Sequence, residues 1–356
     1  MSKPDGSARP KVLFAFNEAV RQNYLDPAEL ARLETFADWD WLPCEGRSNI
    51  YTAEPDPALT ALLGDRLPGY EALILCHGGP IVTGELLAAA PELKLIGELE
   101  GDRFAARLDL PAAWACDIRV VDTTNGSSYA VAEWALGLIL VSLRQGGAHF
   151  RRIIAGQTSR DPALLPQSGG SLQGKRVGLI GGGHMARRLM ALLRPFAVDI
   201  WVHDPYLPAE LAEALDFVQT SLDNLLSQTE VIVCLAPLTP GTRGMLGRRE
   251  LDLIAPGAVL VNVSRGAIID SAALIARLKR GDIVAGLDVF DPEPIPPDSE
   301  LIQLPNVFLS PHIGYHSGRR YPQFFSLMVD ELARFFSGHA TYFDLTPRSR
   351  ANRGGE

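Results

Sequence analysis

The sequence VGLIGGGHMA, residues 177–186, is the clearest indication of how this chain folds. An apolar strand pattern is followed by glycines with the spacing G-x-G-x-x-A, and then by a helix pattern. Glycines at these points let the backbone approach a pyrophosphate, which then lies against the N–H groups of the helix N-terminus. A plain glycine turn is an equally good interpretation of the motif alone. The residues expected to contact a dinucleotide here are Gly181, Gly183, His184 and Met185.

Asp204 ends the next strand pattern, 23 residues after the first glycine of the motif (204 − 181 = 23). An acid about 20 residues beyond that glycine commonly hydrogen-bonds the ribose hydroxyls of a dinucleotide. A turn-forming Asp-Pro pair is the alternative, but the glycine pattern favours the cofactor role. The carboxylate would repel a 2′-phosphate, so the pair of motifs predicts an NAD-binding domain.

Short apolar runs alternate with amphipathic stretches along nearly the whole chain, which is typical of parallel sheets covered by helices. The predicted strands are residues 11–16, 72–76, 93–96, 118–121, 175–180, 198–203, 231–235, 258–263, 283–288 and 307–309. The predicted helices include residues 26–34, 83–90, 111–115, 129–144 and 321–336, with an irregular connection over 145–174. Since 356 residues are too many for one ordinary core, two domains are expected.

Composition narrows the class of protein. The net charge of −9, from 33 basic and 42 acidic residues, argues against nucleic acid as a partner. The N-terminus has no apolar signal core, and no stretch approaches the roughly 20 apolar residues that cross a bilayer, so no membrane partner is expected. No metal site is expected either. The four widely spaced cysteines form no CxxC pair and predict reduced thiols in a cytoplasmic protein.

Three ionisable residues, Arg265, Glu293 and His312, follow strands of the second part, where ligands of open α/β sheets bind. Arg265 precedes a helix pattern, where a cation opposes the helix dipole and has little stabilising value. Its guanidinium could instead grip a carboxylate and an adjacent carbonyl with two parallel bonds, or form a surface salt bridge. A carboxylate beside an imidazole favours the protonated form, which suits a general acid. Each residue taken alone has another interpretation: His312 could be a packed residue, and Glu293 could be a solvated turn residue.

Together these motifs resemble the D-isomer-specific 2-hydroxyacid dehydrogenases, the superfamily of D-lactate, D-glycerate and phosphoglycerate dehydrogenases. The matching stretches are VGLIGGGHMA (177–186), HDP (203–205), LAPLTPGTRGML (235–246), VNVSRGAIID (261–270), AGLDVFDPEP (285–294) and NVFLSPHIG (306–314). VAEWALGLIL (131–140) is similar to the hinge helix of the family, and LAAAPELKLIG (87–97) to a strand of its first domain.

The resemblance implies an α/β fold of two doubly wound domains. A Rossmann NAD-binding domain, residues 126–314, would be inserted into a flavodoxin-like substrate domain made of residues 1–125 and 315–350. A homodimer through the inserted domain would be typical of the family.

The resemblance also implies roles for single residues. Hydride would pass between nicotinamide and C2 of a small 2-oxo or 2-hydroxy acid. Arg265 would bind the carboxylate and carbonyl of that acid, and His312, partnered by Glu293, would be the acid/base. Asp288 would be the ligand of the nicotinamide carboxamide, and Pro237 would belong to the loop beside that ring. Thr242 is also expected to bind the cofactor.

The first domain departs from the family pattern. Where the family has a glycine-rich loop whose N–H groups take the substrate carboxylate, this chain reads Glu98-Leu99-Glu100-Gly101-Asp102-Arg103. Acids there are unfavourable unless they point away or meet a positive or hydroxyl-bearing part of the substrate; a reshaped surface loop is the alternative. The expected substrate contacts are His77, Gly78, Glu98, Gly101 and Tyr315, although a simple turn is the favoured interpretation of His77-Gly78-Gly79.

Two other functions stay open. A non-catalytic NAD-sensing regulator could share the fold, but it would not need the arginine, glutamate and histidine together. Phosphite oxidation is possible on the same scaffold. Formate enzymes that the family includes carry Gln as the histidine partner, so Glu293 argues against formate.

Overall fold

The computed structural model describes residues 9–48, 53–100, 107–159, 170–316 and 322–354. The chain forms two compact units. The first consists of Met1–Ser127 and Ser317–Arg350, and the second of Ser128–His316 with the last residues, Ala351–Glu356. The chain therefore crosses between units at 127/128 and 316/317, two residues beyond the expected boundaries in each case.

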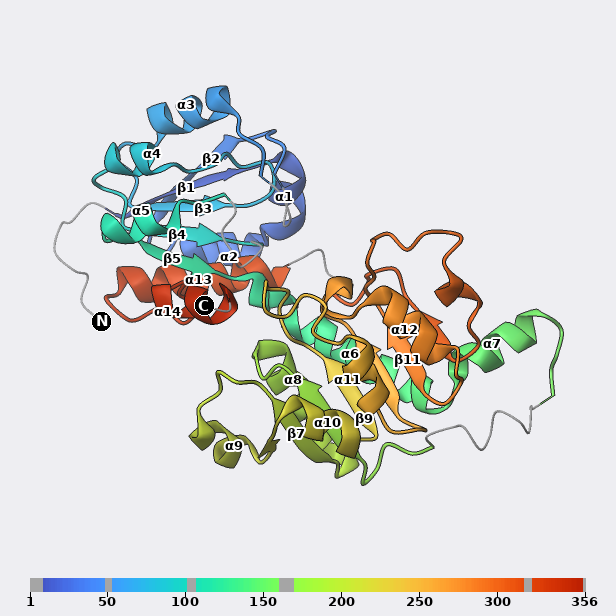
Figure 1. Ribbon diagram of the computed structural model, residues 1–356. Coiled ribbons are helices and arrows are strands. Elements are labelled where there is room, and N and C mark those ends of the chain that lie inside the picture. The colour runs from blue at the N-terminus through green and yellow to red at the C-terminus, as the bar shows by residue number, and fades with distance from the viewer. Residues whose placement is uncertain (1–8, 49–52, 101–106, 160–169, 317–321, 355–356) are drawn as a thin grey trace. The chain divides into compact units, whose positions relative to one another are not determined.

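The first unit holds a five-stranded parallel sheet in the order β2-β1-β3-β4-β5 (Figure 1). Its strands are β1 (Lys11–Phe16), β2 (Asp38–Pro43), β3 (Ala72–Leu75), β4 (Leu95–Glu98) and β5 (Arg119–Asp122). The strand order reverses at β1, where Val12 lies beside Trp39 on one side and Ala72 on the other. Ligands of such sheets bind beyond the carboxyl ends of the strands near this reversal.

Helices cover both faces of this sheet because successive residues of β1 point to opposite sides. Phe14 and Phe16 pack with residues of α1 (Glu18–Tyr24), α2 (Pro27–Leu33) and α13 (Pro322–Phe336). Leu13 and Ala15 pack with residues of α3 (Pro57–Arg66), α4 (Gly84–Ala88) and α5 (Leu110–Ala115). Helix α13 thus brings a late part of the chain onto the sheet formed by its beginning.

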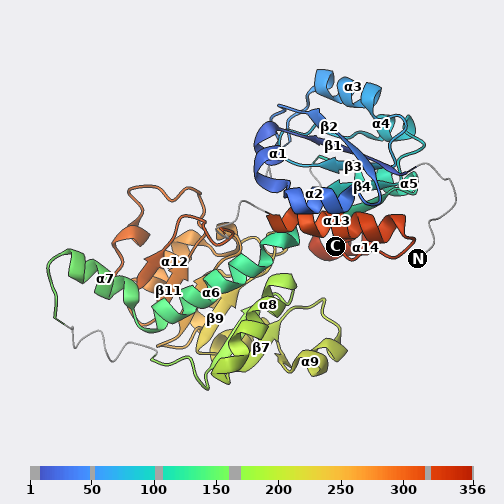
Figure 2. The same ribbon diagram turned by 180° about the vertical axis from the view of Figure 1, so that it is seen from behind.

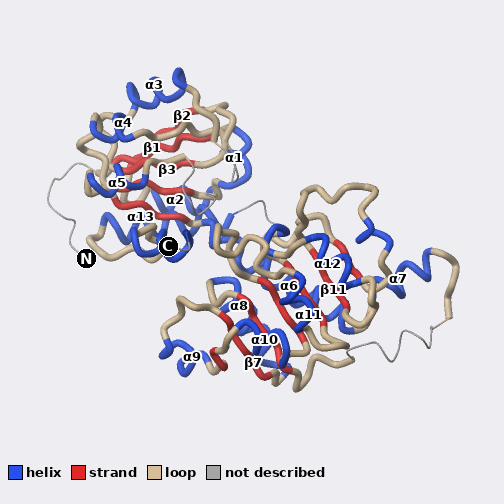
Figure 3. The backbone as a smooth tube through the Cα atoms, in the orientation of Figure 1, coloured by secondary structure: helices blue, strands red, loops and turns tan. Residues whose placement is uncertain are grey.

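The second unit holds a seven-stranded parallel sheet in the order β12-β11-β10-β9-β6-β7-β8. Its strands are β6 (Arg176–Ile180), β7 (Asp199–His203), β8 (Val218–Gln219), β9 (Val231–Cys234), β10 (Val259–Asn262), β11 (Val284–Leu287) and β12 (Val307–Leu309). The order reverses between β6 and β9, and ligands of such sheets bind beyond the carboxyl ends of the strands at this kind of reversal. The helix and strand colouring of Figure 3 shows the alternation of the two in this unit.

Residues of α6 (Ser128–Leu143) and α8 (His184–Leu193) cover one face of the second sheet. Residues of α10 (Leu222–Gln228), α11 (Arg248–Leu253) and α12 (Ser271–Leu278) cover the other. The unit also contains α7 (Gly146–Ile154) and α9 (Ala209–Leu215), and the chain ends with α14 (Pro347–Gly354). Figure 2 shows α6 and α8 in front of this sheet.

Helix α6 corrects one expectation. The helical run Thr124–Leu143 is 20 residues long and, by length and composition alone, apolar enough to cross a membrane. The prediction that no stretch approaches that length is therefore wrong. Half of its most apolar window is buried, and α6 packs on α8, β10 and β11, as the core helix of a globular unit does.

The elements that were not predicted are strands β2 and β8 and helices α1, α3, α7 and α14. The β2 segment reads DWDWLP and alternates polar and aromatic residues, the period-two pattern of an edge strand, whereas the predicted strands were all apolar runs. Helix α7 lies within the predicted irregular connection. All four cysteines are free; burial raises the pKa of the Cys44, Cys76 and Cys234 thiols to about 12, so these three are unreactive.

Candidate active site

The glycine loop follows β6 and leads directly into α8. Gly181 has φ +95°, and a Cβ there would lie 2.8 Å from the backbone nitrogen of Ala236 in the loop after β9. Gly183 is the N-cap of α8, and no side chain caps the helix. Nothing lies within 4 Å of the position that a Cβ on Gly183 would take. Among the described residues, the helix that begins with His184 and Met185 thus has no side-chain cap at Gly183.

Asp204 follows β7 and holds the glycine loop. Its Oδ2 accepts a hydrogen bond from the N–H of Gly182 at 2.9 Å, and its Oδ1 accepts one from the N–H of Tyr206 at 2.9 Å. Each carboxylate oxygen has a second lone pair for a ribose hydroxyl. A helix N-terminus without an acid in its first turn, next to an anchored carboxylate, fits the pyrophosphate and ribose of NAD.

The loop after β9 is shaped by Thr242. Its hydroxyl donates to the carbonyl oxygen of Pro237 at 2.6 Å and accepts from the N–H of Thr239 at 2.8 Å. Thr242 therefore acts on the conformation of the loop that contains Pro237, the residue expected beside the nicotinamide.

His312 and Glu293 contact each other directly. Nδ1 of the imidazole is hydrogen-bonded to Oε1 of the carboxylate, and the two side chains are 25% and 31% exposed. Burial alone would raise the pKa of Glu293, but the hydrogen bond and charge of His312, the N–H of Phe290 and the charge of Arg265 hold that pKa below its usual value. The pair that the sequence predicted is thus brought together.

The charge of Arg265 is the smallest of the causes that hold the pKa of Glu293 down, and Gly266, the residue after it, packs against Phe290, three residues before Glu293. Arg265 is the N-cap residue of a short 3-10 turn, Gly266–Ile268, and donates to the carbonyl oxygen of Ser264 at 2.8 Å. Asn262, 1% exposed, shapes this loop: its side chain accepts from the N–H of Ser264 and donates to the carbonyl oxygen of Arg265. The sequence reasoning missed Asn262, although a polar residue ending a buried strand was a usable signal.

Asp288 is 2% exposed, and its carboxylate accepts hydrogen bonds from the turn that carries His312. Oδ1 accepts from the hydroxyl of Ser310 at 2.5 Å and from the N–H of Ile313 at 3.0 Å, and Oδ2 accepts from the N–H of Gly314 at 2.9 Å. These bonds give Asp288 a structural task; they lend no support to its expected role as a ligand of the nicotinamide carboxamide. The ring of Tyr315 lies edge-on to His312, with centroids 6.1 Å apart.

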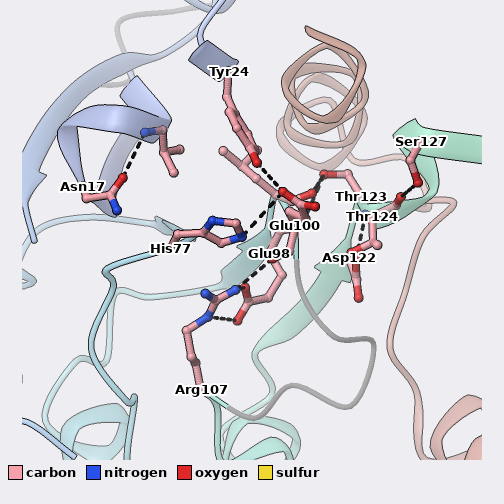
Figure 4. A network of polar contacts seen from close by, with 12 residues as sticks. Asn17, Tyr24, His77, Glu98, Glu100, Arg107, Asp122, Thr123, Thr124 and Ser127 are labelled. Atoms are coloured by element: carbon pink, nitrogen blue, oxygen red, sulfur yellow. Dashed lines mark hydrogen bonds and ion pairs between the residues drawn. The ribbon is translucent and has the colours of Figure 1, made fainter. Parts of the chain in front are cut away.

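The first unit has its own polar network at the ends of β3 and β4 (Figure 4). Glu98 and Arg107 are 1% and 2% exposed and form a buried ion pair through two hydrogen bonds. Glu98 is therefore buried and paired with Arg107, and its expected contact with substrate stays a prediction. The next acid, Glu100, accepts a hydrogen bond from the hydroxyl of Tyr24, and the imidazole of His77 lies 3.5 Å from it.

His77 is neutral at physiological pH because burial, and then the charge of Arg107, lower its pKa to about 4. Its contact with Glu100 is for that reason not an ion pair. The N–H of Gly78 donates a hydrogen bond to the carbonyl oxygen of Ser48 at 3.0 Å. Gly101 lies outside the described residues. In the described part of the chain, no group of three or more His, Cys, Asp or Glu side chains is placed to hold a metal ion.

A parallel sheet with a glycine loop at its reversal point, leading into an uncapped helix, defines a dinucleotide-binding protein of the α/β class. Comparison with known proteins identifies the family within this class. Residues 136–314 match the family model described as D-isomer specific 2-hydroxyacid dehydrogenase, NAD binding domain. The chain belongs to the D-isomer-specific 2-hydroxyacid dehydrogenase family, and NAD is the cofactor of the second unit. The predicted resemblance, two-domain α/β fold and cofactor are thereby confirmed.

Among relatives, a D-3-phosphoglycerate dehydrogenase of Methanocaldococcus jannaschii is 32% identical over 271 residues, which cover 75% of this chain and 50% of that protein. A mitochondrial formate dehydrogenase of Hordeum vulgare is 30% identical over 308 residues, covering 84% and 79%. The structure of a glyoxylate reductase from Paecilomyes thermophila is 25% identical with a TM-score of 0.70, covering 96% and 100%. The chain spans about half the length of the phosphoglycerate dehydrogenases that it matches.

Proposed function

We propose that this protein is an NAD-dependent oxidoreductase that interconverts a small 2-hydroxy acid and the corresponding 2-oxo acid. In the oxidative direction, the 2-hydroxy acid and NAD⁺ give the 2-oxo acid, NADH and a proton. The observation that carries this proposal is the His312–Glu293 pair with Arg265 in electrostatic reach, at the strand ends of the NAD-binding unit.

His312 serves as the acid/base in this proposal. Because Nδ1 is bonded to Glu293, Nε2 is the nitrogen that exchanges a proton with the hydroxyl of the substrate. In oxidation Nε2 takes the hydroxyl proton, and the carboxylate of Glu293 stabilises the resulting imidazolium. In reduction the same nitrogen returns the proton to the carbonyl oxygen.

Arg265 serves to bind and orient the acid. Its guanidinium can form parallel hydrogen bonds to the carboxylate and to the oxygen on C2, which holds C2 in place for transfer. NAD, bound along the glycine loop, supplies the hydride acceptor or donor. The polarised C2 oxygen then lies between the arginine and the histidine, so that positive charge is present where negative charge develops.

Formate oxidation is the competing reaction, since the barley relative is named a formate dehydrogenase. Conversion of formate to carbon dioxide releases a hydride but involves no hydroxyl proton, so an acid/base pair would have nothing to do. The Glu293–His312 contact therefore favours a 2-hydroxy acid. Phosphite oxidation is the further reaction to include in the test.

The test is turnover by the purified chain. NADH oxidation is followed with glyoxylate, pyruvate, hydroxypyruvate and phenylglyoxylate, and NAD⁺ reduction with formate and phosphite. We expect turnover with at least one 2-oxo acid, and its loss in Arg265→Lys, which keeps the charge but not the planar fork. Turnover with formate or phosphite alone, or NADH binding without any turnover, would contradict the proposal.

We also propose that the protein is a homodimer assembled through the second unit. Phe150, Ile153 and Ile154 of α7 are 62%, 59% and 70% exposed, and their spacing places them on one face of the helix. An exposed apolar face of this kind on a folded domain favours burial against a second copy. Light scattering after size-exclusion chromatography should give a dimer, and Phe150→Glu with Ile154→Glu a monomer. A wild-type monomer at micromolar concentration would refute the assembly.

A further inference from the structure

The turn that carries His312 has an unusual backbone. His312 has φ +53°, in the left-handed region that non-glycine residues rarely adopt. Such a conformation persists only when surrounding contacts impose it. Here the N–H of His312 donates to the carbonyl oxygen of Asp288 at 2.8 Å, and the two residues that follow it donate to the Asp288 carboxylate. The direction of the imidazole therefore depends on where Asp288 is held.

Trp134, on α6, is a further donor to this carboxylate. Its indole N–H lies 3.1 Å from Oδ1 of Asp288 and 3.1 Å from the hydroxyl oxygen of Ser310. The indole also supports the turn by contact: a Cβ on Gly314 would lie 3.2 Å from Cδ1 of Trp134 and 2.9 Å from Oδ2 of Asp288. Only a residue without a side chain fits between the turn, the carboxylate and the ring.

We propose that Trp134 is a positioning residue for His312: its indole N–H, shared by Asp288 and Ser310, holds the turn in the conformation that presents the imidazole to Glu293 and to substrate. The catalytic part of this inference rests on the proposed function. The positioning part does not, because it concerns the orientation of a side chain in the protein without substrate.

Trp134 and the turn that carries His312 lie near the two points at which the chain enters and leaves the second unit. Helix α6 begins at Ser128, the first residue of the second unit, and the turn ends two residues before His316, where the chain leaves that unit. The hydrogen bond between Trp134 and Asp288 thus connects α6, with which the chain enters the second unit, to the turn just before the chain leaves that unit. A displacement of α6 would move the indole of Trp134 and, through its hydrogen bond, the turn that carries His312.

The test compares two tryptophans of the same unit. Trp134→Phe keeps an aromatic ring and removes the N–H donor. Trp201→Phe is the matched control, because the Trp201 indole N–H donates to the Asp199 carboxylate at 2.9 Å and has no contact with the His312 turn among the bonds described. Replacing Trp134 by 3-benzothienylalanine, which has the shape of tryptophan without its N–H, separates the loss of the donor from the loss of packing.

Two readouts are measured on each variant. The first is kcat and KM as a function of pH, and the second is the NMR signal of the His312 imidazole in the protein without cofactor, assigned by its absence in His312→Gln. We expect kcat to fall at least about tenfold for both changes at position 134, with KM and NADH affinity nearly unchanged, because a small misplacement of a catalytic group is costly. The pH profile and the His312 signal should shift with it, and Trp201→Phe should leave both as in the wild type.

The proposal is overturned if the benzothienyl protein keeps the kcat, pH profile and imidazole signal of the wild type, since the N–H would then be dispensable. It is also overturned if Trp201→Phe shows equal changes. Should the wild type turn over none of the acids, the proposed function fails, whereas the imidazole signal still decides whether Trp134 positions His312.

Discussion

Gly266 lies directly against the backbone of Phe290: a Cβ on Gly266 would fall 1.8 Å from the carbonyl oxygen of Phe290. The loop after β10, which carries Arg265, is therefore pressed onto the segment after β11 that leads to Glu293. Since β10 and β11 are neighbours in register, with Asn262 beside Leu287, the close approach continues the pairing of the two strands beyond their ends. Arg265 precedes Gly266 directly and Glu293 follows Phe290 by three residues, so both lie next to this contact in the chain.

Gly266→Ala should therefore damage both stability and activity. A methyl group at 1.8 Å from a backbone oxygen must force the two segments apart, at a cost of about 1–3 kcal/mol or more in the free energy of unfolding. Urea unfolding and kcat/KM would both record the change. Gly183→Ala is the contrasting variant: it has open space for a methyl group and should cost about 1 kcal/mol at most, but should weaken NADH binding. Equal stability losses in the two variants would contradict this account.

Glu293→Gln should lower kcat by about 10²-fold, because the amide cannot stabilise the imidazolium as the carboxylate does. NADH affinity, measured by fluorescence, should be unchanged. Asp291→Asn, a change of the same kind in the same turn, serves as the control and should keep most of the activity. If the two variants were equally active, Glu293 would not be the functional partner of His312.

Asp204→Ala should reduce the preference for NADH over NADPH by about tenfold or more, which corresponds to 1.4 kcal/mol of lost discrimination. The carboxylate is the group that would repel a 2′-phosphate, and its removal also releases the N–H of Gly182. Asp199→Ala, at the start of the same strand, changes the net charge equally and should leave the ratio as it is. An unchanged ratio of kcat/KM values in Asp204→Ala would rule out the ribose assignment.

His77 should make the protein less stable in mild acid. Its pKa falls from 6.5 to about 4 on folding, so between these values the unfolded chain binds a proton that the folded protein does not. The free energy of unfolding contributed by this group therefore decreases as the pH falls from 6.5 and levels off near 4, by at most about 3 kcal/mol. His77→Gln should flatten this part of the pH dependence in urea titrations. Parallel curves for wild type and variant would show that the imidazole is not desolvated.

Sequence alone was sufficient for the features that local chemistry determines. The strand, glycine loop and helix of residues 177–186 follow one another along the chain, and the acid at position 204 ends the next strand. The pairing of His312 with Glu293 was also predictable, because parallel neighbouring strands deliver the residues after them to the same edge of a sheet.

Only the tertiary structure shows which polar side chains already have hydrogen-bond or ion-pair partners within the protein. Glu98 belongs to an acidic stretch that could be a surface loop, but in the structure Glu98 is buried and forms an ion pair with Arg107. Asp288 is predicted as a cofactor ligand, and only the structure shows that Trp134 and the turn after β12 also donate to its carboxylate. Both outcomes depend on contacts between residues far apart in the chain. A sequence states the hydrogen-bonding capacity of each side chain, whereas packing determines which partner comes within reach of it.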